Sequence, residues 1–191
     1  TSVNGDANTA RTSLIPLGRR INRAAASPDF FRYPRIVLAV DSEHEGAGFA
    51  GFPYLRDRLF VGFQEKANAM EVISYNDQVG RFEFQLVEDY GAGIEPKVSY
   101  VERSTCTGCH QNEGPIFPRP PWQETENNRE VFDLMASAVS SSGAELPIFR
   151  SGDAAYIDGS TNRANKFALY QLFWRGVCQA GSEHDRVRCR A

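Results

Sequence analysis

Five short runs of β-branched and aromatic residues, closely spaced between residues 35 and 102, constrain the fold of this chain more than any other feature. They are RIVLAV (35–40), RLFVGF (58–63), AMEVISY (69–75), RFEFQLVED (81–89) and KVSYVE (97–102). In the fourth run apolar and polar residues alternate, with Phe82, Phe84 and Leu86 on one face and Arg81, Glu83 and Gln85 on the other. Such alternation is typical of a strand with one solvated face. Turn-forming residues separate the later runs, so we expect an antiparallel β meander with one wet face.

The composition changes after residue 105, where helical periodicity replaces the alternation. One segment begins at Asn128, whose side chain can cap a helix, and continues with apolar residues at helical spacing. A second segment has Thr161 or Asn162 as its expected cap and an apolar stripe formed by Ala168, Leu169, Leu172 and Phe173. Strands followed by helices predict an α+β fold. We expect a basic N-terminal arm at 1–34 and one domain at 35–191, which is β-rich at 35–104 and has a loop with two cysteines and a histidine, followed by helices, at 105–191.

The charge balance narrows the classes of partner. The 24 acidic residues outnumber the 21 basic ones and give a net charge of −3. Affinity for nucleic acid rests largely on cations that neutralise phosphates, so no nucleic-acid partner is expected. Residues 1–40 are locally basic, with six arginines against two aspartates, which suits either a solvated tail or an arm that docks on an acidic partner. No apolar run approaches the length needed to cross a bilayer, so no membrane span is expected.

The motif CTGCH at residues 106–110 carries the clearest chemical signal. A Cys-x-x-Cys-His run is the attachment signature of a c-type haem. Two thiols three residues apart on a tight turn can reach the two vinyl groups at one edge of the porphyrin, and the adjacent imidazole then lies over the ring centre. We therefore expect Cys106 and Cys109 to form thioethers with one haem c, and His110 to be its proximal iron ligand.

In this motif and the loop that follows it, the chain resembles the c-type cytochromes. The resemblance implies that the proline-rich run GPIFPRPPW (114–122) packs on the haem edge and offers a backbone carbonyl to the other nitrogen of His110. Proline restricts the backbone, which suits a loop that forms a rigid wall. Pro118 would belong to that wall, and Phe117 and Trp122 would keep water from the iron. The alternative for this run is a rigid surface turn with a proline-rich recognition role.

The four cysteines fall into two pairs, and each pair has alternative interpretations. Cys106 and Cys109 could instead bind zinc with the second pair, or form a thioredoxin-like dithiol. Cys178 and Cys189 enclose a polar loop of ten residues close to the chain end. A disulfide there would restrain a terminus that otherwise frays, and it would imply an oxidising compartment; two free thiols are the alternative. We expect haem attachment, the disulfide, and a periplasmic or secreted location.

The sixth iron position distinguishes the candidate functions. Met135 is the first protein candidate, because it lies 25 residues after His110 on an expected helix and a thioether is a common haem ligand in electron carriers. Its place on one stripe with Val131 and Leu134 also suits it to filling the core. His44 and His184 are further candidates, with simple solvent exposure as the alternative for each. The position could equally be open or hold water.

These features favour a mono-haem c-type cytochrome that passes single electrons to a redox partner protein. The alternative is a haem enzyme with an open iron site, acting on peroxide or a small nitrogen species and able to bind a small-molecule ligand. Whether the chain is an enzyme therefore depends on the sixth ligand. A non-haem zinc or dithiol binding module is the second alternative.

Overall fold

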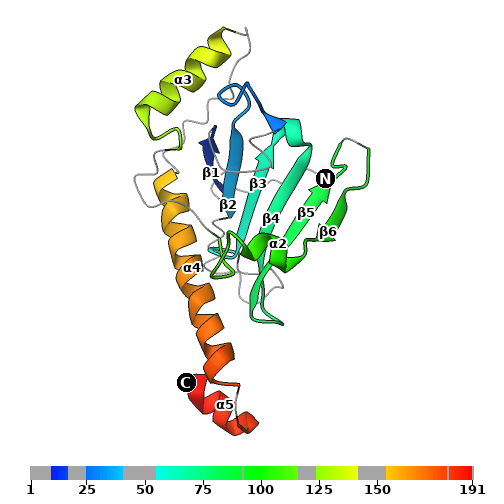
Figure 1. Cartoon of the computed structure of the whole chain (residues 1–191), viewed down its shortest axis with the longest axis vertical. Helices are drawn as coiled ribbons and strands as arrows, with labels where there is room; N and C mark the ends of the chain where they lie inside the picture. The colour runs from blue at the N-terminus through cyan, green and yellow to red at the C-terminus, as the bar shows by residue number, and fades with distance from the viewer. Residues whose placement is uncertain are drawn as a thin grey trace, which may run out of the picture.

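The fold is built on a six-stranded sheet whose strands are hydrogen-bonded in sequence order (Figure 1). The computed structural model describes residues 10–16, 25–40, 55–91, 93–115, 124–141, 154–179 and 181–190. The strands are β1 (Ala10–Ile15), β2 (Arg35–Val40), β3 (Leu59–Gln64), β4 (Ala69–Asn76), β5 (Arg81–Glu88) and β6 (Lys97–Tyr100). Every neighbouring pair is antiparallel, and helices make up most of the second half of the chain. The expected meander and the α+β class are confirmed.

The edge strand β1 lies inside the segment where we expected only a basic arm. It pairs along its whole length with β2, and its last three residues are buried. Glu126, itself 8% exposed, accepts hydrogen bonds from Ser13 Oγ (2.9 Å) and from the Leu14 backbone N–H (2.8 Å). Residues 10–15 are therefore part of the sheet, and the expected five runs form the strands from β2 to β6.

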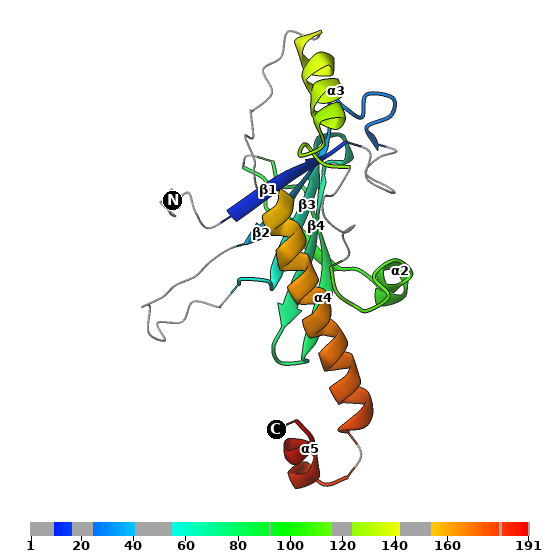
Figure 2. The same ribbon diagram turned by 90° about the vertical axis from the view of Figure 1, so that its left-hand side faces the viewer.

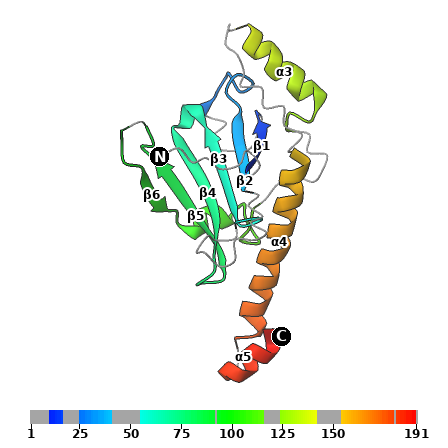
Figure 3. The same ribbon diagram turned by 180° about the vertical axis from the view of Figure 1, so that it is seen from behind.

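The main core lies between one face of the sheet and helix α4 (Ala154–Val177). Phe60 and Phe82 point from the sheet into this layer, where they pack with Ile157 and Ala164 of the helix. All four side chains are at most 3% exposed. The helix then continues beyond the sheet, as the view from the side (Figure 2) and the view from behind (Figure 3) show. Its first half is consequently a core element, and its second half projects outward.

Helix α4 begins seven residues before Thr161, so the cap expected at Thr161 or Asn162 was wrong. The polar residues that suggested a loop have hydrogen-bond partners, one in the turn before β3 and one in the helix itself. Ser160 Oγ donates to Asp57 Oδ1 (2.6 Å), and Thr161 Oγ1 donates to the Ile157 carbonyl (2.9 Å). The expected apolar stripe also divides: Ala168 is buried, whereas the large side chains beside it, Leu169 and Phe173, are exposed.

Helix α3 (Arg129–Ser140) packs on the opposite face of the sheet, near β1. Asn128 caps it as expected, because its Oδ1 accepts from the Glu130 N–H at 2.9 Å. Met135 and Val131 are buried against Leu14. Part of the face that we expected to be wet is thus covered.

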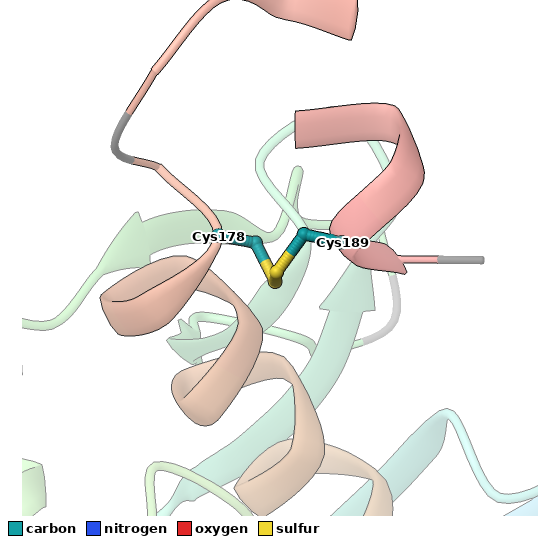
Figure 4. Close-up of a disulfide and its surroundings, with 2 residues drawn as sticks. All are labelled: Cys178 and Cys189. Atoms are coloured by element: carbon teal, nitrogen blue, oxygen red, sulfur yellow. A yellow bond between two sulfur atoms is a disulfide. The ribbon is translucent and has the colours of Figure 1, made fainter. Parts of the chain in front are cut away.

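Two short helices complete the described structure. Helix α2 (Arg103–Thr107) follows β6 directly and carries the first cysteine of the motif, and a 3-10 turn η1 (Glu65–Ala67) links β3 to β4. Helix α5 (Glu183–Arg190) is tied to the end of α4 by the Cys178–Cys189 disulfide, with the two Cα atoms 5.5 Å apart (Figure 4). The expected disulfide is confirmed. None of the described helices combines the length and apolar character that crossing a bilayer requires.

Candidate functional site

The motif residues form one helical turn at the end of α2. The backbone N–H groups of Cys109 and His110 both donate to the Cys106 carbonyl, at 3.1 and 2.9 Å. Side chains three apart on such a turn lie on the same side of it, so Cys106 and Cys109 are neighbours. Neither is in a disulfide; Cys109 is exposed and Cys106 is half-buried. Two thiols and an imidazole are therefore presented together at the surface.

The His110 ring is held in a defined orientation. Its Nδ1 lies 2.7 Å from the carbonyl oxygen of Gly114, and its ring packs against Phe84 with centroids 5.2 Å apart. A backbone carbonyl accepts but cannot donate, so this contact requires the proton on Nδ1 and leaves the ring lone pair on Nε2. Metal-ligating histidines are typically oriented by this kind of second hydrogen bond. The carbonyl belongs to the residue just before the first proline of the loop.

Glu113 joins the motif to the two neighbouring elements. Its Oε2 lies 2.7 Å from Arg103 Nη2 on α2 and 3.0 Å from Arg175 Nη2 on α4. Arg103 also donates to the Phe82 carbonyl at 2.7 Å and pairs with Glu83 at 3.4 Å. Glu83 also accepts from Arg81 Nε at 2.7 Å, and these two arginines compensate its charge, since Glu83 is only 8% exposed although the alternation assigned it to the wet face. Glu113 thus links α2 to α4.

Further contacts fix the loop after His110 against α4. Asn112 Nδ2 donates to the side-chain oxygen of Asn165 at 3.2 Å. Gly114 passes so close to the helix that a Cβ there would lie 2.9 Å from Asn165 Oδ1 and 3.0 Å from the Ala168 Cβ. The close approach requires a residue without a side chain at this position. The ring of His110 is therefore bounded by β5 on one side and by a loop seated on α4.

The chemistry of the thiols argues against a dithiol redox site. Burial raises the pKa of the Cys106 thiol, the nearby Glu71 carboxylate raises it further, and Arg103 lowers it. A reactive cysteine needs the opposite environment, because the thiolate is the nucleophile. The raised pKa favours the protonated thiol at Cys106, which does not suit this residue to attack a disulfide.

The four-cysteine zinc site loses its second pair of ligands. Cys178 and Cys189 are bonded to one another, so they cannot join Cys106 and Cys109 around a metal. Within the described ranges, no group of three or more His, Cys, Asp or Glu side chains is arranged to hold a metal ion. A donor set of two thiols and one oriented imidazole fits a covalently held haem instead.

The other candidate iron ligands are placed away from His110 or outside the described residues. Met135 packs with Ile36, whereas His110 packs with Phe84. The cross-strand pairs put Phe84 on the same face as Ala39, and Ile36, three residues earlier in β2, is on the other face. The structure therefore does not bring Met135 and His110 together. The two views in Figures 1 and 2 agree, since α3 lies at the upper end of the sheet and α2 lies beside its lower half.

The remaining expected residues can be located only in part. His184 lies exposed on α5, which the disulfide holds at the projecting end of α4. His44, Phe117, Pro118 and Trp122 lie outside the described residues. Sequence reasoning missed Glu113, Arg103 and Arg175. The available signal was weak: an acidic residue between the histidine and the glycine of HQNEGP, with no indication of its partners.

Comparisons with protein-family models, with curated proteins and with solved structures found no match. The functional argument therefore rests on the site itself.

Proposed function

We propose that this chain is a mono-haem c-type cytochrome that transfers single electrons. Haem would be bound through thioethers to Cys106 and Cys109, formed by adding each S–H across a vinyl group, with the sulfur bonded to one vinyl carbon and the hydrogen to the other. His110 would supply the proximal nitrogen, Nε2. When bound, the haem supplies an iron centre that cycles between the ferric and ferrous states.

The observation that carries the proposal is the 2.7 Å contact between His110 Nδ1 and the Gly114 carbonyl. It orients the imidazole and fixes the tautomer that a proximal ligand needs. The exposure of Cys109 supports the transfer role, because a haem attached there would have its thioether edge at the protein surface, where a redox partner protein could approach. The disulfide supports a periplasmic or secreted location, since such bonds persist in oxidising compartments.

The test is attachment itself. The chain produced with a cytochrome c maturation system should carry one haem that survives denaturation, seen in the mass and in the reduced pyridine-haem spectrum. Cys109→Ala should leave a single thioether or lose the haem on denaturation, and His110→Ala should change the iron ligation. A wild-type chain that never acquires covalent haem would refute the proposal.

A haem enzyme with an open iron site is the second candidate, and one observation favours it. Met135 packs on the sheet face opposite to His110, so the most obvious protein sixth ligand is not beside the proximal one. An open position would allow peroxide or a small nitrogen species to reach the iron. Ready binding of carbon monoxide by the reduced protein and of cyanide by the ferric protein would favour the enzyme over the carrier.

A further inference from the structure

The turn that presents His110 contains an acidic residue in an unusual backbone conformation. Glu113 has φ 60°, in the left-handed region that glycine and asparagine adopt most readily. Its N–H donates to the His110 carbonyl at 2.8 Å. The next carbonyl in the chain, that of Gly114, is the one that lies 2.7 Å from His110 Nδ1. The backbone on both sides of Glu113 is thus bonded to His110.

The side chain of Glu113 is held from two directions. Arg103 comes from α2 and Arg175 from α4, and both guanidinium groups approach the same oxygen, Oε2, at 2.7 and 3.0 Å. All three side chains are half-buried, at 23–26% exposure. Partly buried ion pairs that share one carboxylate form a network, which holds its members in place better than an isolated surface pair does.

We propose that Glu113 is a positioning residue for His110. By joining α2 to α4 through its carboxylate, it keeps its own strained turn closed and so holds the Gly114 carbonyl against Nδ1. The consequence for a bound haem follows from the ligand. An imidazole whose Nδ1–H is hydrogen-bonded is a more basic donor, and a more basic donor favours ferric iron. The redox consequence rests on the proposed function, whereas the hydrogen bond itself requires no haem.

The chain contains a matched control for the side chain of Glu113. Asp57 also has a positive φ, 59°, and its carboxylate also pairs with an arginine of α4, Arg163, at 2.6 Å. Asparagine adopts the left-handed region more readily than glutamate, so Glu113→Asn removes the carboxylate without adding backbone strain, and Asp57→Asn removes its carboxylate with little change in backbone preference. Asp57 belongs to the turn before β3 and has no bond to His110 among the described residues.

The first measurement uses the full haem-free chain with its disulfide intact. At alkaline pH, where imidazole is neutral, ¹⁵N NMR of the His110 ring reports the ratio of the two tautomers. We expect one dominant tautomer, with the proton on Nδ1, in the wild type and in Asp57→Asn. In Glu113→Asn the ratio should fall about fivefold, the effect of losing one hydrogen bond of ordinary net strength. An unchanged ratio, or an equal fall in Asp57→Asn, would overturn the proposal.

The second measurement uses the haem-loaded protein. The reduction potential of Glu113→Asn should rise relative to the wild type, and that of Asp57→Asn should not change. Equal potentials in all three proteins would contradict the redox consequence. The two measurements also separate this inference from the proposed function: if haem never attaches, the tautomer ratio still decides whether Glu113 positions His110.

Discussion

Two substitutions of Met135 can distinguish whether this side chain fills the core or binds the haem iron. Its side chain is 1% exposed and packs with Leu14 and Val131 between α3 and the sheet. Met135→Ala removes three buried heavy atoms, worth about 0.8 kcal/mol each in transfer free energy. A residual cavity of roughly 50 Å³ adds about 1 kcal/mol. We expect the free energy of unfolding to fall by about 3.5 kcal/mol.

Met135→Leu is the more informative variant, because it conserves volume while removing the sulfur. Its free energy of unfolding should fall by less than about 1.5 kcal/mol. Since Met135 lies on the sheet face opposite to Phe84 and His110, the ferric absorption spectrum of the haem-loaded protein should be unchanged.

The assays are urea unfolding followed by circular dichroism, and ferric absorption spectroscopy of the haem-loaded variants. Met70→Ala is the matched control, since Met70 on β4 is only half-buried and its truncation should cost less than that of Met135. A Met135→Leu protein that is as stable as wild type but has lost a low-spin ferric spectrum would show that the sulfur reaches the iron. That result would refute the argument from sheet faces. A loss below about 1 kcal/mol in Met135→Ala would refute the core role.

Three further predictions concern other parts of the chain. Reduction of the Cys178–Cys189 disulfide should speed amide hydrogen exchange in α5 by up to about a hundredfold, with little effect on the sheet. A disulfide that closes a loop of this length stabilises the folded segment by about 3 kcal/mol, and the described side chains of α5 are all exposed, so they add no packing of their own. Burial raises the pKa of Asp158 above its ordinary value of 3.8, so the folded state loses stability as the pH rises from 3.8 through the raised pKa of this carboxyl. Asp158→Asn should therefore unfold at a higher temperature than wild type at pH 7 and at the same temperature below pH 3.8, as thermal unfolding across pH would show. Gly114→Ala should lower the free energy of unfolding by about 1–3 kcal/mol, because its Cβ would lie 3.0 Å from an alanine Cβ of α4, whereas Gly108→Ala, with nothing nearer than 3.9 Å, should have little effect in the same urea titration.

The sequence by itself determined the elements whose signal is local. Alternation of β-branched and aromatic residues places β2 to β6 within two residues of their ends, because a strand's period of two is written in neighbouring positions. The cap at Asn128 is equally local, since its bond reaches only two residues along the chain. The Cys-x-x-Cys-His motif is also local, because its five residues form one helical turn whose spacing places the two thiols on the same side.

Elements whose polar residues find distant partners could not be recognised from the sequence. From the sequence, Ser160 resembles a loop residue; in the structure its hydroxyl donates a hydrogen bond to Asp57, 103 positions away. The sequence does not indicate this partner, so the predicted start of α4 was too late. Strand β1 was missed for a similar reason. Half of the residues in this strand are polar, and the acceptor of its Ser13 hydroxyl and Leu14 N–H groups is Glu126, more than a hundred residues away.

Only the tertiary structure decided which residues meet around His110. Met135 lies near enough in sequence to be a ligand, but α3 and the motif pack on opposite faces of the sheet. Glu113 meets Arg175 across 62 positions of sequence, because the loop after the motif is seated on α4. The physical reason is the same in both cases. Residue spacing determines which side of its own element a side chain occupies. Which face of the sheet a helix covers depends instead on packing between segments that are distant in sequence, and no short stretch of sequence indicates that packing.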